Sequence, residues 1–223
     1  MKFKEYADRE MLFLSLAGQV AGELGQALRS AGQASLAVAG GSTPLPLYDL
    51  LSAVELDWEN VAVMLTDERC VPEDDPRSNL GQIRKRLLRA AASPARVMPL
   101  YLHHAGEAGR VETLGAAVAE KLPLTTAVLG MGEDLHIASL FPGAPELALA
   151  LSSSAPPLME INAPGQPERR VSLTLPVLRD AMNIHLVILG QAKREALESS
   201  KGSSAELAPV RAIVENATVH WAE

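Results

Sequence analysis

The stretch VLGMGEDLHIASLFPG, residues 128–143, sets Asp134 and His136 directly after a glycine-rich end of an apolar run. An imidazole there can take a proton from water near neutral pH, and a neighbouring carboxylate can orient it. The alternative is a partly buried histidine that hydrogen-bonds to loop carbonyls, which is the more common situation for a lone histidine. The stretch therefore raises the hypothesis that His136 is a general base.

The segment GGST, Gly40 to Thr43, offers a second kind of chemistry. Its two glycines let the backbone approach a ligand closely, Ser42 and Thr43 supply hydroxyl donors, and the positive end of a following helix favours an anion. Together these groups could hold a phosphate. The alternative is an ordinary glycine-rich turn with Ser42 or Thr43 as a helix cap, which a short motif alone favours. Because the lysine of a Walker motif is absent, the segment does not predict an ATP loop.

Several cations could contact an anion at the same site. Lys193 and Arg194 stand at the start of a predicted helix, where the helix dipole disfavours cations unless a bound anion compensates. Arg69 and the pair Arg169 and Arg170 are further candidates, because a guanidinium matches two phosphate oxygens. Each of these side chains taken alone is more often a solvated surface group.

A metal site is the weaker interpretation of the acidic residues. Asp67, Glu68, Asp134 and His136 lack the spacing of a metal motif such as HExxH. The single cysteine, Cys70, excludes an internal disulfide and a cysteine-rich zinc motif. We therefore expect no metal and no other cofactor.

The elements around these residues alternate between short apolar runs and helical patterns. A spacing of four between Leu12, Leu16, Val20 and Leu24 predicts a helix over residues 8–30. The alternation predicts an α/β fold: a mainly parallel sheet with helices on both faces, Rossmann-like and three-layered. A serine- and proline-rich stretch, residues 152–167, predicts a long loop or a small added strand excursion.

This architecture would bring the candidate residues together. The segments GGST, TDER, GMGEDLH and GQAK each follow an apolar run that reads as a strand. In an open α/β sheet the ligand crevice lies at the carboxyl ends of the strands. We therefore expect these four segments to converge although they are far apart in the sequence.

The length, composition and charge of the chain limit the classes of protein to which it can belong. With 223 residues, 48% of them hydrophobic, we expect a single domain over residues 1–223. A net charge of −7 gives no sign of the clustered positive charge that nucleic-acid binding needs. The N-terminus lacks the pattern of a signal peptide, no apolar run is long enough for a membrane span, and one cysteine fits a reducing compartment. We expect a cytoplasmic protein without a nucleic-acid or membrane partner.

Five segments also carry a resemblance: VAGGSTPLPLYDLL, LTDERCVPEDDPRSNLGQIRKRLL, LGMGEDLHIASLFPG, RRVSLTLPVL and ILGQAKREAL. In this order and spacing the chain resembles the 6-phosphogluconolactonases, in a superfamily shared with glucosamine-6-phosphate deaminase. The resemblance implies hydrolysis of 6-phospho-D-glucono-1,5-lactone to 6-phosphogluconate in the oxidative pentose phosphate pathway. It implies no metal or organic cofactor, a phosphorylated sugar lactone as the partner, and a monomer or small homo-oligomer.

The combined hypothesis gives each candidate a role. Ser42, Thr43, Arg170 and Lys193 would hold the 6-phosphate with the backbone of Gly40 and Gly41, and His136 would act as general base on the attacking water. Arg69 would stabilise the developing oxyanion, and Asp67 and Asp134 would orient Arg69 or His136. A sugar-phosphate isomerase or deaminase is the alternative. A non-catalytic sensor would need an output module, for which the chain shows no pattern.

One position departs from the family pattern. The family usually has Asp-Gly-His-Thr where this chain has Asp134, Leu135, His136 and Ile137. If the backbone at residue 135 has a positive φ, leucine should be strained by roughly 1 to 2 kcal/mol. We expect the loop to have adapted to the leucine.

Overall fold

A parallel sheet forms the centre of the computed structural model, which describes residues 1–103 and 110–223. All its neighbouring strands run parallel. In the described residues it has seven strands: β1 (Lys2–Glu5), β2 (Ala34–Val38), β3 (Val61–Leu65), β5 (Arg96–Met98), β6 (Thr126–Gly130), β9 (Asn183–Leu189) and β10 (Thr218–Ala222).

The order of the strands, β1-β10-β9-β6-β2-β3-β5, contains one reversal of direction. From β2 the chain builds outward through β3 to β5, and it then returns to β6 on the other side of β2 and continues through β9 to β10. The reversal lies between β2 and β6. Ligands of open α/β sheets bind at such a switch point, outside the carboxyl ends of the strands.

A second, smaller sheet is antiparallel and consists of β4 (Asp67–Arg69), β8 (Arg170–Leu173) and β7 (Leu158–Ile161), with β8 in the middle. The strand β4 follows β3 after a single residue, Thr66, so the chain passes directly from one sheet into the other. The small sheet therefore begins at the carboxyl end of the large one.

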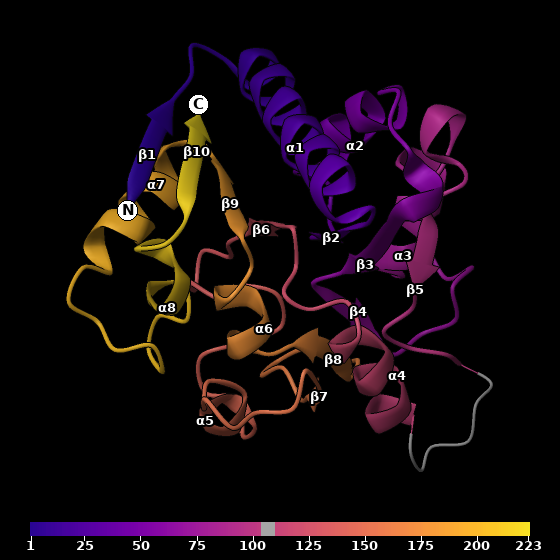
Figure 1. Cartoon of the computed structure of the whole chain (residues 1–223). Helices are drawn as coiled ribbons and strands as arrows, with labels where there is room; N and C mark the ends of the chain where they lie inside the picture. Colours follow the sequence, from indigo (N-terminus) through magenta and orange to yellow (C-terminus); the bar gives the residue numbers. More distant parts are fainter. Residues whose placement is uncertain (104–109) are drawn as a thin grey trace.

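The helices lie on both faces of the large sheet. Their bounds are α1 (Arg9–Ala31), α2 (Leu45–Ser52), α3 (Asn79–Arg86), α4 (Arg110–Ala119), α5 (Leu147–Ala150), α6 (Leu175–Arg179), α7 (Gln191–Ser199) and α8 (Arg211–Val214), with short 3-10 helices at Trp58–Asn60 and Ala90–Ala92. Figure 1 shows α1 and α2 on one side of the sheet, and α6 and the small sheet on the other.

Local signals explain the longest helix. Asp8 caps α1 by accepting a hydrogen bond from the Met11 backbone N–H at 2.8 Å, and Gly32 ends it with φ of 70°. The leucine stripe predicted for residues 8–30 is buried against the sheet. The sheet needs this cover, because the strands β2 and β3 are buried along their whole length.

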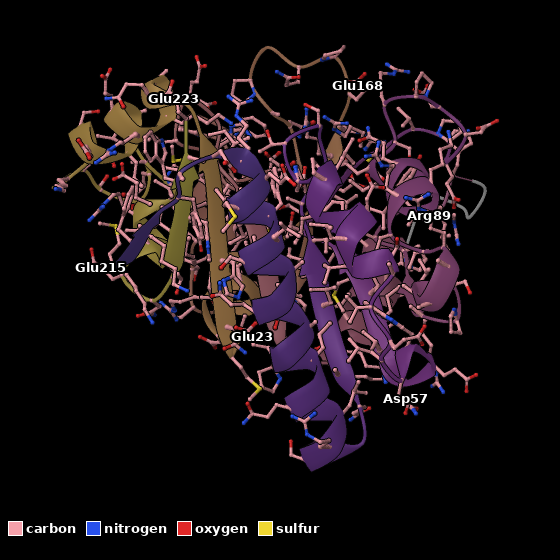
Figure 2. The ribbon with its side chains drawn as sticks, turned by 90° about the horizontal axis from the view of Figure 1, so that it is seen from above. Glu23, Asp57, Arg89, Glu168, Glu215 and Glu223 are labelled. Carbon is pink, nitrogen blue, oxygen red and sulfur yellow. The ribbon has the colours of Figure 1, made fainter. Side chains whose placement is uncertain are left out.

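A chain of buried polar groups ties α1 to the edge of the sheet. His220 lies between Tyr6 and His185, with its two ring nitrogens 2.8 Å from Tyr6 Oη and 3.0 Å from His185 Nδ1. His185 Nε2 in turn lies 3.0 Å from a carboxylate oxygen of Glu23 on α1. In Figure 2, Glu23 and Asp57 lie away from the end of the molecule that carries Glu168. Its Glu23 end therefore lies away from the segment that carries Glu168, whereas Tyr6 directly follows the carboxyl end of β1.

The predicted architecture is confirmed, with one local correction. The segment TDER, expected only to follow a strand, contains β4, which belongs to a different sheet from β3. The stretch 152–167, expected to be a long loop or a small added strand excursion, contains β7, so the strand excursion is confirmed. No helix of the described residues is both long and apolar enough to cross a membrane.

Candidate active site

A pocket of about 320 Å³ lies at the switch point between β2 and β6. This volume falls in the range of small-molecule sites. Its walls combine the segments that follow β2, β3, β6 and the start of α7 with the small sheet. Of the candidate residues, the pocket is lined by Gly40, Gly41, Ser42, Thr43, Asp67, Arg69, His136, Arg170 and Lys193. The predicted convergence of distant segments is therefore observed, and Asp134 joins the site through its contact with His136.

The loop Gly40–Thr43 curls between β2 and α2. Gly41 has φ of 85°, which an L side chain rarely adopts. At Gly40 a Cβ atom would lie 2.0 Å from the side-chain amide of Asn79, so only glycine lets the two segments touch. The helix α2 begins without a side-chain cap. The alternative interpretation, in which Ser42 or Thr43 caps this helix, is therefore wrong.

Pairing between β4 and β8 explains how two arginines reach the pocket. Arg69 lies opposite Arg170 in the antiparallel register, and Asp67 lies opposite Ser172. Because side chains alternate between the two faces of a strand, these four residues share one face, and Glu68 points to the other. Glu68 accepts hydrogen bonds from the backbone N–H groups of Asn79 and Leu80 instead.

Arg170 is the most deeply buried cation of the site, with 8% of its surface exposed. Its Nη1 lies 3.6 Å from a carboxylate oxygen of Asp67, and its Nη2 donates to Gln166 at 3.3 Å. The guanidinium also lies 5.3 Å from the centre of the Phe141 ring. Burial lowers the pKa of Arg170, and the charge of Asp67 opposes the shift. A bound anion would stabilise this cation further.

Asp67 occupies a different place from the one expected. Its carboxylate accepts hydrogen bonds from Ser139 Oγ at 2.6 Å and from Thr66 Oγ1 at 3.3 Å, and it faces Arg170. The interactions described for this chain include none between Asp67 and the side chains of Arg69 or His136. Its position therefore suits it to hold Arg170 rather than to orient the base.

His136 is held by two neighbours. Its Nδ1 lies 2.5 Å from a carboxylate oxygen of Asp134, and its ring stacks on Phe141 with the centroids 4.1 Å apart. A Cβ at Gly132 would lie 2.2 Å from the imidazole, so this glycine makes room for the pair. Because the carboxylate accepts a hydrogen bond from Nδ1–H, the neutral imidazole has its free lone pair on Nε2. The imidazole is 27% exposed and can meet water.

Leu135 has the left-handed conformation that the family glycine predicts, with φ of 68°. Its backbone N–H donates to the Gly132 carbonyl at 3.0 Å, and its own carbonyl accepts from the Val210 N–H at 3.1 Å. The side chain is half-buried and packs against the hydrophobic core. Loop contacts on both sides therefore hold a strained residue in place between Asp134 and His136.

Three polar atoms in this pocket lack partners. In the part of the chain that the structure describes, the buried side-chain nitrogen and oxygen atoms without a hydrogen bond are Arg69 Nε, Arg170 Nε and Asn79 Oδ1. All three residues line the same pocket. Buried polar atoms are nearly always satisfied, so their concentration at one place points to a polar ligand. Two are donors suited to an anion and one is an acceptor.

The remaining candidate cations differ in whether they line the pocket. Lys193 lines the pocket from the first turn of α7. Arg194, its neighbour, lies over the Trp221 ring at 4.5 Å and forms ion pairs with Glu5 and Glu198 at 3.2 Å. Arg169 pairs with Glu160 at 2.9 Å on the exposed side of the small sheet. Lys193 and Arg170 therefore belong to the site, whereas Arg194 and Arg169 have structural contacts elsewhere.

Sequence reasoning missed two residues of the site. Asn79 stands within the segment LTDERCVPEDDPRSNLGQIRKRLL, but its polar side chain gave no sign that it would be buried. Phe141 lies in the apolar end of the stretch 128–143, and nothing in its neighbours along the chain indicated that its ring contacts both His136 and Arg170. Both contacts depend on residues distant in the sequence.

Within the described ranges no group of three or more His, Cys, Asp or Glu side chains is arranged to hold a metal ion. Metal independence stays a prediction.

Comparison with known proteins places this geometry in a family. The family model described as glucosamine-6-phosphate isomerases/6-phosphogluconolactonase matches residues 7–221. The chain belongs to this family. It is 39% identical over 223 residues to the 6-phosphogluconolactonase of Mesorhizobium japonicum, covering 97% of this chain and 93% of the relative. The corresponding enzyme of Pseudomonas aeruginosa is 40% identical over 210 residues, covering 92% and 88%.

Solved structures of the family have the same fold. A 6-phosphogluconolactonase from Shewanella baltica superimposes with a TM-score of 0.93 at 31% identity, covering 99% of this chain and 96% of the other. A monomeric glucosamine-6-phosphate deaminase also matches, with a TM-score of 0.77 at 21% identity, covering 99% and 97%. The second likeness shows the fold alone. Sequence similarity thus connects this chain with the lactonases.

Proposed function

We propose that this protein hydrolyses 6-phospho-D-glucono-1,5-lactone to 6-phosphogluconate, the activity named for its relatives in the family. One observation carries the proposal: a His136–Asp134 pair opens onto the same pocket in which buried arginine donors lack partners. Such a pocket offers a base for water beside a site for an anion. The reaction belongs to the oxidative pentose phosphate pathway.

The phosphate lies at the loop between β2 and α2. Ser42 and Thr43 donate their hydroxyls, the Gly40 and Gly41 backbone approaches closely, and Arg170 and Lys193 supply positive charge. The geometry that supports this assignment is the shared pocket and the unpaired Nε of Arg170. Binding of this remote group positions the lactone carbonyl beside the base.

The chemical step uses the Nε2 lone pair of His136. As the water oxygen forms its bond with C1, His136 takes a proton from the water, and Asp134 stabilises the resulting imidazolium. Arg69 stabilises the negative charge that develops on the carbonyl oxygen. When the tetrahedral intermediate collapses, the bond from C1 to the ring oxygen breaks, and His136 returns its proton to that oxygen. Asp67 positions Arg170 throughout.

The test is a coupled assay that follows loss of the lactone above its spontaneous hydrolysis. His136→Asn should lower kcat by about 10² to 10⁴ while binding of 6-phosphogluconate and the melting temperature persist. The matched control is His103→Asn, which changes an exposed histidine outside the pocket and should leave kcat unchanged. A variant at His136 with a lowered melting temperature and normal turnover per folded molecule would contradict the proposal.

The deaminase reaction is the competing assignment, and it is tested in the same preparation. Ammonia release from glucosamine 6-phosphate, at a rate comparable with lactone hydrolysis, would assign the protein to the other branch of the family. Turnover of the lactone with no ammonia release is the expected result.

The proposal extends to the organisation of the chain. One hydrophobic cluster includes Val38 of the large sheet, Val171 and Leu158 of the small sheet and Leu16 of α1, which supports a single lactonase domain over residues 1–223. We further propose a cytoplasmic monomer or small homo-oligomer. Sedimentation analysis of the purified protein measures its oligomeric state.

A further inference from the structure

The side-chain amide of Asn79 is buried, and only one of its two polar atoms has a hydrogen-bond partner. It is the first residue of α3, with 2% of its surface exposed, and it lines the pocket. Its Nδ2 donates to the Asp67 backbone carbonyl at 2.9 Å, whereas its Oδ1 has no partner. A buried acceptor without a donor is destabilising, so the unpaired oxygen points to a partner that the protein itself does not supply.

The direction of the amide is fixed by its surroundings. If the amide were turned over, Oδ1 would face the Asp67 carbonyl oxygen, and two acceptors would meet without a proton. The backbone N–H of Asn79 donates to Glu68 at 2.8 Å, and Ser78 caps the helix through Gly81 at 3.1 Å. The residue therefore has an acceptor, and not a donor, unpaired at the wall of the pocket.

Gly40 packs directly against the side-chain amide of Asn79. The Asn79 amide lies against Gly40 so closely that a Cβ atom would lie 2.0 Å from Oδ1. The unpaired oxygen is thus held beside the loop assigned to the phosphate, at a pocket that Arg69 and Arg170 also line. A phosphate dianion has no proton to donate to it. A hydroxyl group has one.

We propose that Asn79 Oδ1 accepts a hydrogen bond from a ring hydroxyl of the sugar lactone, and so selects a hydroxylated substrate. This inference rests on the proposed function and adds to it a residue that recognises a hydroxyl group of the sugar rather than the phosphate. A site built to hydrogen-bond a substrate hydroxyl discriminates against the analogue that lacks it, because its own polar atom is then left buried and unpaired.

The experiment measures kcat/KM for the parent lactone and for its 2-deoxy, 3-deoxy and 4-deoxy analogues, with the wild type, Asn79→Ala and Ser78→Ala. For the wild type, one deoxy lactone should be about 10- to 100-fold poorer than the parent. In Asn79→Ala, the parent should fall by a similar factor, and the penalty for that analogue should disappear. Ser78→Ala weakens the same helix start without reaching the pocket, so it should keep the full discrimination.

Two results would overturn the inference. If the wild type has the same kcat/KM for all three deoxy lactones as for the parent lactone, none of these hydroxyl groups is recognised. This measurement uses the wild type alone, so it does not depend on the folding of a variant. An unchanged penalty in Asn79→Ala would mean that another group reads the hydroxyl. The parent lactone is measured first: no turnover of it would contradict the proposed function as well, whereas turnover without discrimination would contradict the role of Asn79 alone.

Discussion

Replacing Leu135 with glycine tests how the loop tolerates a left-handed leucine. The positive φ should cost about 1–2 kcal/mol for an L side chain, and glycine would release it. Against this gain, the half-buried leucine loses contacts worth about 1 kcal/mol, and glycine adds backbone freedom worth about 0.5–1 kcal/mol. The free energy of unfolding should therefore change by no more than about 1 kcal/mol.

The matched control is Ala90→Gly. Ala90 also has a positive φ, of 48°, but its side chain is exposed, so glycine there releases strain without removing packing. We expect this control to be stabilised by about 0.5 kcal/mol. The difference between the two variants then measures the packing of the Leu135 side chain.

Urea denaturation of both variants, with kcat measured for each, completes the test. If Leu135→Gly is stabilised as much as Ala90→Gly, the leucine side chain contributes no compensating contact. If its kcat also rises, the strain limits catalysis. Either result would refute the argument that the contacts with Gly132, Val210 and the core have adapted the loop to leucine.

Four other outcomes are expected. Lys193→Ala should raise KM for the phosphorylated lactone more than it lowers kcat, with little effect on unphosphorylated gluconolactone; equal losses on both would exclude a phosphate contact. Phe141→Leu should lower kcat and raise KM together, each about tenfold, because its ring contacts both His136 and Arg170. Exhaustive chelation should leave activity intact, and loss with rescue by a divalent ion would show that a metal is needed. Burial lowers the pKa of His220 to about 3, so the unfolded chain binds more protons below pH 6.5. The free energy of unfolding should then fall by about 2 kcal/mol between pH 7.5 and 5, a loss that His220→Gln should remove.

The sequence predicts most of this fold because the strong signals are local. Leucines spaced by four, a capping aspartate and continuous apolar runs specify α1 and the central strands without help from the rest of the chain. The rule that ligands bind at the carboxyl ends of parallel strands then places His136 and Lys193 in one pocket. No contact between distant residues is needed for these steps.

The parts that were missed depend on such contacts. The three residues of β4 look like the end of β3, and only their pairing with β8 reveals a second sheet. The same pairing turns Asp67 toward Arg170 instead of toward the base. The unpaired oxygen of Asn79 exists because α3 docks against Gly40. No local pattern records either event, since both arise when segments far apart in the chain come together.

The alternation of side chains along β4 has a consequence for how this region can change in evolution. Asp67 and Arg69 share the face that lines the pocket, while Glu68 points away and anchors the start of α3. Deleting or inserting one residue after Thr66 would exchange the two faces, since the side-chain period of a strand is two. The acid that anchors a helix would then enter the pocket, and the pocket arginine would leave it. A change of length here therefore displaces three side chains at once, whereas a point substitution changes only one.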